Sequence, residues 1–126
     1  MKIRTRQFAE VTMVDVGGRI VAGEEATLLR DSIRTLLVLG EKNIILNLGD
    51  VPYIDSAGIG ELASAYVAVK KAGGCLALLN LTRRVREVLE IVHLVTVFQI
   101  FESEDDALSG LKPASFRPQE MMARAG

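Results

Sequence analysis

The sequence of 126 residues predicts a single α/β domain in which a mixed β-sheet is flanked by about four helices. Three observations support this prediction: an alternating apolar and polar pattern near the N-terminus, two short apolar runs further on, and amphipathic stretches between them. Strands that alternate with helices in this way are typical of βαβ units. The domain is expected to cover residues 1–111.

The N-terminal part of the chain predicts short strands. Residues 11–16 alternate apolar and polar side chains, and Gly17 and Gly18 separate them from a second run at residues 19–22. Two such runs joined by Gly-Gly predict a β-hairpin, because glycine adopts positive φ at little cost in a two-residue turn. Residues 3–8 are expected to add an edge strand.

Helical spacing begins at Glu24. Leu29, Ile33 and Leu36 recur at intervals that line one face of a helix, and Gly40 is expected to end it. Residues 43–48 form a nearly continuous apolar run, which predicts a strand covered on both faces.

A second helix is predicted from Ala57 to Lys71, because a stripe with helical spacing follows the loop at residues 49–54. The side chains expected on this stripe are Ile59, Leu62, Ala63, Tyr66, Val67 and Lys70.

The rest of the domain repeats the pattern of strand and helix. Residues 75–79 predict a buried strand, Thr82 is a suitable N-cap for a third helix, and residues 97–101 predict a last strand. Ser103 and the acidic residues after it predict a last helix that ends near Leu111. Residues 112–126 carry two prolines and no sustained apolar period, so a flexible C-terminal tail is expected.

Composition excludes several classes of function. The 15 Lys and Arg residues and 16 Asp and Glu residues give a net charge of −1, which argues against a general nucleic-acid-binding protein. Cys75 is the only cysteine, so no internal disulfide forms and a reducing compartment is expected. No apolar run reaches the ~18 residues of a membrane span. We therefore expect a cytoplasmic protein that acts without a membrane, a metal or a cofactor.

The stretch most informative about chemistry is residues 50–62, which joins a predicted buried strand to a predicted helix. Asp55 and Ser56 fall where the helix N-cap is expected, and either side chain could accept hydrogen bonds from the first backbone N–H groups. The simplest interpretation of this stretch is a capped helix start.

Two enzymatic interpretations fit less well. Residues 58–63 match the G-x-G-x-x-A pattern of a dinucleotide site, but the strand is expected to end near Leu48, ten residues before Gly58. The acidic residue expected ~20 positions later is also missing. A hydrolase nucleophile at Ser56 would need glycine in place of Ile54 and an activating base, and the single histidine, His93, lies in an apolar segment.

A third interpretation makes Ser56 the acceptor of a regulatory phosphate. A phosphoserine adds about −1.5 to −2 charges and three acceptor oxygens, and a helix N-terminus tolerates such an anion. The fold would remain intact while the charge of the surrounding surface changes. Such a site would control binding.

Residues 55–60, Asp-Ser-Ala-Gly-Ile-Gly, resemble the D-S-[ST/A]-G-[LI]-G signature of STAS domains, specifically of the bacterial anti-sigma factor antagonists (anti-anti-sigma factors). The resemblance extends over residues 11–111 and implies a small α/β domain with a curved mixed sheet. It also implies a non-enzymatic regulator of transcription. In its unphosphorylated form it would bind an anti-sigma factor that is also a serine kinase, and so release a sigma factor.

The resemblance further implies that phosphorylation by this kinase breaks the complex, that a serine phosphatase restores it, and that the domain is a monomer or weak homodimer. It makes Ser56 the phosphoacceptor, with Asp55 as a positioning and capping residue. The partner-binding residues that it implies are Gly23, Glu24, Asp55, Ser56, Ala57, Gly58, Ile59 and Gly60.

The chain departs from the family pattern at two positions. Ala26 stands where a G-[ED]-x-D pattern often has an acidic residue, and Asn47 stands where the strand before the signature often has aspartate. Neither change affects Ser56. The alternatives are a scaffold subunit of a stressosome-like assembly and, ranked lower, a small nucleotide-binding or hydrolytic domain.

Overall fold

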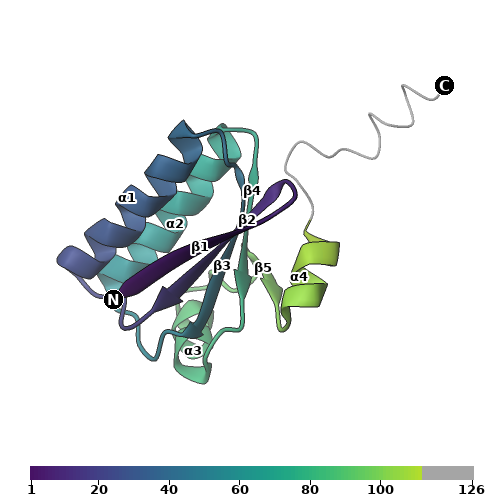
Figure 1. Ribbon diagram of the computed structural model, residues 1–126. Coiled ribbons are helices and arrows are strands. Elements are labelled where there is room, and N and C mark those ends of the chain that lie inside the picture. The colour runs from purple at the N-terminus through teal and green to yellow at the C-terminus, as the bar shows by residue number, and fades with distance from the viewer. Residues whose placement is uncertain (112–126) are drawn as a thin grey trace.

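The computed structural model describes residues 1–111. They form one five-stranded sheet with four helices, which confirms the predicted α/β class (Figure 1). In chain order the elements are β1 (Lys2–Phe8), β2 (Val11–Gly17), α1 (Glu24–Val38), β3 (Asn43–Asp50), α2 (Ser56–Lys71), β4 (Cys75–Leu79), α3 (Arg83–Ile91), β5 (Gln99–Phe101) and α4 (Glu104–Gly110). Residues 112–126, for which a flexible tail is predicted, lie outside the described residues.

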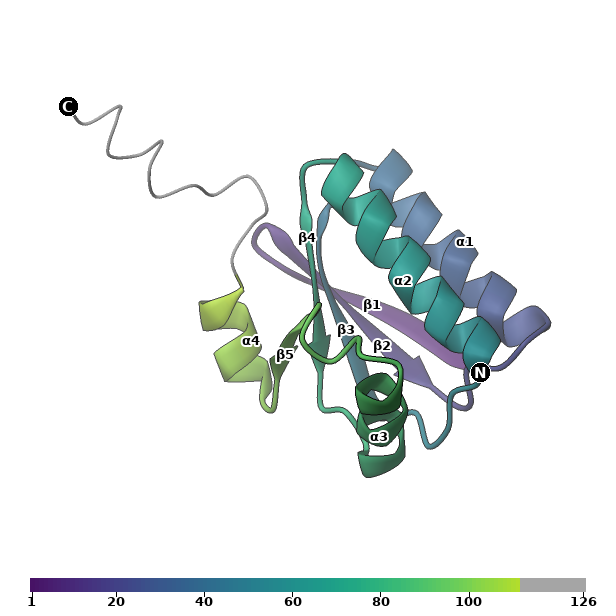
Figure 2. The ribbon, with the colours of Figure 1, turned by 180° about the vertical axis from the view of Figure 1, so that it is seen from behind.

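The strands follow one another in the sheet in chain order, with β1 and β5 at the two edges. β1 pairs with β2 in the antiparallel sense, and the three remaining neighbours pair in parallel. α1 and α2 lie side by side across one face, whereas α4 lies on the opposite face beside β5 (Figures 1 and 2). α3 shares its core with α1 and α2.

The apolar side chains form two cores, one on each face of the sheet. The larger core lies under α1, α2 and α3 and includes Leu46, Leu62 and Leu89. The smaller core lies under α4, where Ala107 packs with Ile45 and Leu79. Because both faces are covered, β4 consists of buried apolar residues throughout, and β3 carries the buried apolar run of residues 44–46.

The N-terminal hairpin differs from the prediction. It is formed by β1 and β2, so the edge strand expected at residues 3–8 is confirmed. Its turn lies at Ala9 and Glu10, where Ala9 has a φ of 53°. Residues 19–22 form no strand, and Ile20 makes only an isolated bridge to Ile54. The Gly-Gly pair therefore marks the exit from β2, and the segment after it runs beside the loop between β3 and α2.

The apolar stripe of α2 is also rotated from its predicted position. Val67 is 49% exposed. The buried residues of the helix are Gly58, Ile59, Leu62, Ala65 and Val69. Small and apolar residues occur around most of this helix, so spacing alone did not identify its buried face. No helix within residues 1–111 has the length and apolar character needed to cross a membrane.

Candidate functional site

Ser56 is the first residue of α2 and is exposed to solvent. The loop before it is anchored by Val51 and Ile54, which are 0% and 1% exposed, while Pro52 and Tyr53 lie on the surface. Apolar anchoring on both sides holds the loop against the core. Its last turn therefore presents the Ser56 hydroxyl at the surface.

Asp55 joins two segments of the chain. One carboxylate oxygen, Oδ1, accepts a hydrogen bond from the backbone N–H of Gly58 (2.9 Å), which caps α2. The other, Oδ2, accepts from the backbone N–H of Ala22, also at 2.9 Å. The bond from Ala22 has the largest effect on the pKa of Asp55, followed by the bond from Gly58, and together they hold this pKa below its ordinary value. Asp55 is thus an anion at neutral pH and holds the segment before α1 against the start of α2.

Backbone hydrogen bonds reinforce this junction. The N–H of Ile20 donates to the carbonyl of Tyr53 (3.1 Å), and the N–H of Asp55 donates to the carbonyl of Ile20 (3.2 Å). Gly23 follows with a φ of 102° as the N-cap of α1. Two segments about thirty residues apart in sequence therefore meet at one end of the helical layer.

The predicted partner-binding residues differ in their exposure. Gly23, Glu24, Ser56 and Gly60 are exposed, Asp55 and Ala57 are half-buried, and Gly58 and Ile59 are buried. A Cβ on Gly58 would collide with the carbonyl oxygen of Ile20 and lie 2.6 Å from Cγ1 of Ile54. Gly58 thus lets α2 lie close to Ile20, in the segment before α1, and to Ile54. The sequence analysis did not predict this packing role. A Cβ on Gly60 would meet nothing within 4 Å.

Thr82 and Arg84 support the loop, and the sequence analysis did not predict the contact of either residue with it. The hydroxyl of Thr82 donates to the carbonyl of Val51 (2.8 Å) and accepts from the N–H of Val85 (3.4 Å). The guanidinium carbon of Arg84 lies 5.6 Å from the ring centre of Tyr53. The start of α3 therefore adds contacts to the loop beyond those of the segment before α1.

The geometry disfavours the two enzymatic interpretations. Gly58 and Gly60 lie inside α2, several residues after the end of β3, whereas a dinucleotide site needs its first glycine in the turn after a strand. His93 is exposed after α3, and among residues 1–111 no hydrogen bond links it to Ser56. The same residues contain no group of three or more His, Cys, Asp or Glu side chains that could hold a metal ion.

Comparisons with known proteins agree with this architecture. Residues 2–107 match the family described as STAS domain. BtrV of Bordetella bronchiseptica, named as an anti-sigma factor antagonist, is 28% identical over 112 residues, which cover 83% of this chain and 97% of BtrV. The anti-sigma-B factor antagonist of Bacillus subtilis is 34% identical over 84 residues, covering 64% and 76% of the two chains.

A solved structure of similar fold is the Bacillus cell fate determinant SpoIIAA in its phosphorylated form. It has a TM-score of 0.70 and 19% identity and covers 88% of this chain and 100% of its own. Since the family match extends over most of the described residues, the chain belongs to the STAS domain family.

Proposed function

We propose that this chain is an anti-sigma factor antagonist controlled by phosphorylation of Ser56. In the unphosphorylated state it binds an anti-sigma factor that is also a serine kinase, and the sigma factor is released. The observation that carries the proposal is the exposed Ser56 hydroxyl at the N-terminus of α2, beside the Asp55 carboxylate. The chain acts as a binding module and does not itself catalyse a reaction.

The relatives support this role. BtrV and the Bacillus subtilis protein are named as anti-sigma factor antagonists, and SpoIIAA, which shares the fold, is known in a phosphorylated form. The segment that carries Ser56 here also matches the signature of this group of proteins.

The position of Ser56 explains how a phosphate would change binding without unfolding the domain. A helix N-terminus stabilises an anion through its free N–H groups and its dipole, so the fold tolerates the phosphate. On the surface, however, a charge of about −2 is added next to the ionised Asp55. A partner that packs on this surface must then bury two neighbouring anions. A loss of about 3–4 kcal/mol in binding would weaken affinity several hundredfold.

The docking surface that we propose combines both segments joined by Asp55. Its exposed members are Gly23, Glu24, Ser56 and Gly60. Gly60 leaves space above α2 for close approach, and Glu24 places a negative charge at the start of α1. Because the partner is itself the kinase, docking on this surface also brings Ser56 to the kinase, and the added phosphate then breaks the complex. A serine phosphatase then resets the switch.

The test is incubation of the full chain with the anti-sigma factor kinase of the same organism and ATP, followed by mass spectrometry. Phosphate is expected on Ser56 and to be absent in Ser56→Ala, which should retain binding to the kinase. Ser64→Ala is the matched control, because Ser64 is also exposed on α2 but lies two turns further along. Phosphate on another residue, or a Ser56→Ala variant that remains under phosphorylation control, would contradict the proposal.

A further inference from the structure

Tyr53 is an exposed aromatic residue in the loop that leads to Ser56. It is 37% exposed, whereas the other aromatic residues within 1–111 are partly or fully buried. On either side of it along the loop, Val51 and Ile54 are buried. The carbonyl of Tyr53 accepts a hydrogen bond from the backbone N–H of Ile20 (3.1 Å). The backbone of Tyr53 is therefore held in place while its side chain lies at the surface.

An arginine of α3 lies over the Tyr53 ring. The guanidinium carbon of Arg84 is 5.6 Å from the ring centre, a distance at which an aromatic ring attracts a cation. Arg84 is exposed and forms no ion pair with a carboxylate of residues 1–111, whereas its neighbour Arg83 pairs with Glu87 (3.2 Å). The surface at the start of α3 thus presents an apolar ring beside a positive charge that no carboxylate of the described domain balances.

Tyr53 lies close enough to Ser56 to be covered by the same partner. The two residues are three positions apart, so their Cα atoms are separated by at most about 11 Å. A stable interface buries about 800 Å² on each partner, which corresponds to a circular patch with a radius of about 16 Å. The loop runs from beside α3 to the start of α2 (Figure 2). A partner centred on Ser56 therefore reaches Tyr53 and the start of α3.

We propose that Tyr53 and Arg84 extend the docking surface toward α3 and anchor the anti-sigma factor kinase. This inference rests on the proposed function. The Tyr53 ring enters an apolar recess of the kinase, and Arg84 pairs with a carboxylate at the rim of that recess. Tyrosine and arginine are enriched among the residues whose loss weakens protein interfaces most. Because Arg84 already restricts the ring in the free protein, less side-chain entropy is lost on binding.

Arg84 also gives the docking surface charges of both signs. Glu24 and the ionised Asp55 are negative and lie at the starts of α1 and α2, whereas Arg84 is positive and lies at the start of α3. Complementary charges on two proteins fix the orientation in which they dock. A kinase that carries an acidic group opposite Arg84 thus docks in one orientation, which presents Ser56 for phosphorylation.

The test is the affinity of the full chain for the anti-sigma factor kinase of the same organism, measured by calorimetry without ATP so that Ser56 stays unphosphorylated. Tyr53→Ala should weaken binding about thirtyfold or more, as the loss of an interface anchor does. Arg84→Gln should weaken it about fivefold and make the affinity less dependent on salt. Tyr53→Phe keeps the ring and should bind like the wild type.

Two variants on α3 are the matched controls. Arg83→Gln removes an arginine next to Arg84 whose side chain is 93% exposed and whose charge is already paired with Glu87. Ile91→Ala removes an apolar side chain that is 74% exposed at the other end of the helix. Both should leave the affinity for the kinase unchanged. Thermal unfolding of every variant checks the fold, and Arg84→Gln keeps the test decisive if Tyr53→Ala is unstable.

The outcomes separate this inference from the proposed function. If the kinase binds the wild type and phosphorylates Ser56, while Tyr53→Ala and Arg84→Gln bind as tightly as the controls, the inference is overturned and the proposed function stands. If the wild type does not bind the kinase, both are overturned. If Tyr53→Ala loses self-association in sedimentation experiments and keeps its affinity for the kinase, Tyr53 contacts a second copy of the chain, and the inference is again overturned.

Discussion

Two glycines that stand two positions apart in α2 have opposite surroundings. Gly58 lies against the carbonyl of Ile20, with no room for a side chain, whereas Gly60 faces open space. The same residue type therefore serves packing at one position and surface access at the other. Chemical identity alone does not reveal this difference, because it depends on which side of the helix faces the segment before α1.

The two glycines should respond to alanine in opposite directions. Gly58→Ala should destabilise the fold by about 1–3 kcal/mol, because the added methyl group overpacks a closed contact. Gly60→Ala should stabilise it by about 0.5–1 kcal/mol, because alanine is the better helix former at an exposed position. Urea denaturation of both variants measures this difference. A similar loss of stability in both would show that Gly60 is not in open space.

The Thr82 hydroxyl links α3 to the loop before Ser56. Thr82→Val should lose the helix cap and the bond to Val51, at a cost of about 1–2 kcal/mol of the free energy of unfolding. Thr82→Ser is the control, since serine retains the hydroxyl and caps helices well. Thermal unfolding of the two variants compares them, and equal melting temperatures would argue against the link.

At the scale of elements, α4 is fastened to the sheet by one arginine. Nε of Arg6 donates to Asp15 (2.7 Å), and its two terminal nitrogens donate to the Glu104 carboxylate (3.1 and 3.0 Å). Asp15 also accepts from Asn47 (2.9 Å). Since α4 has only seven residues, it gains little from helix propensity alone, and its position depends on this network and on the small core beneath it.

Arg6→Met should therefore loosen α4. It leaves the Glu104 carboxylate without its ion pair and Asp15 with only Asn47 and the longer contact to Arg4, and it should cost about 1–3 kcal/mol of the free energy of unfolding. Amide hydrogen exchange is expected to accelerate in α4 more than in α2. Arg4→Met is the control on the same strand, because Arg4 is largely exposed and makes a single longer contact to Asp15 (3.4 Å). If both variants exchange alike, the network does not hold α4.

The sequence was sufficient to predict those helices that begin at capping or acidic residues of their own. Thr82 is predicted as an N-cap and residues 103–106 as the acidic start of the last helix, and both helices begin where expected. The hairpin turn was not found, because Ala9 and Glu10 carry no turn signal. At the candidate site, the position of Asp55 and Ser56 at the start of α2 could be predicted from the sequence. The hydrogen bond from Ala22 to Asp55 could not, because it depends on tertiary contacts.

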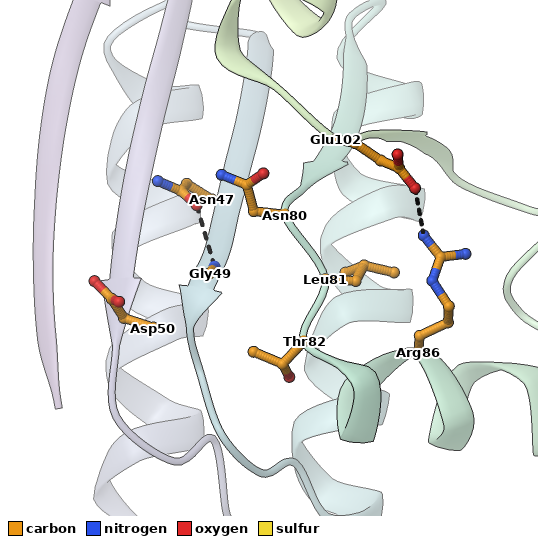
Figure 3. A pocket seen from close by; sticks show the side chains of 8 residues that line it. All are labelled: Asn47, Gly49, Asp50, Asn80, Leu81, Thr82, Arg86 and Glu102. Atoms are coloured by element: carbon orange, nitrogen blue, oxygen red, sulfur yellow. Dashed lines mark hydrogen bonds and ion pairs between the residues drawn. The ribbon is translucent and has the colours of Figure 1, made fainter.

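For the whole molecule, the feature least accessible to sequence reasoning is the polar cavity at the carboxyl ends of β3, β4 and β5 (Figure 3). Asn47, Asn80 and Arg86 belong to segments that only the sheet topology brings together. None of them forms a motif with its sequence neighbours. The order of the strands and the opposite placement of α3 and α4 create this environment, and both are properties of the complete fold.

Two aspartates should govern the acid stability of the whole domain. Burial raises the pKa of Asp15, but its hydrogen bonds with Arg6 and Asn47 outweigh burial, so the pKa of Asp15 lies below its ordinary value. The pKa of Asp55 is lowered as well. As the pH falls below about 4, the unfolded chain binds protons at these groups before the folded chain does. Stability present above that pH is then lost as the pH passes through the folded pKa values.

The free energy of unfolding, measured with urea between about pH 7 and about pH 3, should show this loss. Asp55→Asn is expected to flatten the acid part of the curve, because the titrating carboxylate is gone. Asp31→Asn, on the exposed surface of α1, is the control and should leave the shape of the curve unchanged. A wild-type curve that stays level to pH 3 would contradict the prediction.

The edges of the sheet bear on how the domain associates with other chains. β5 has three residues, and β1 carries Lys2, Arg4 and Arg6 on one of its faces. Short or positively charged edge strands disfavour pairing with the edge strand of a second molecule, and this protects the domain against aggregation through its sheet edges. Extension of the sheet by a second chain is therefore disfavoured at both edges.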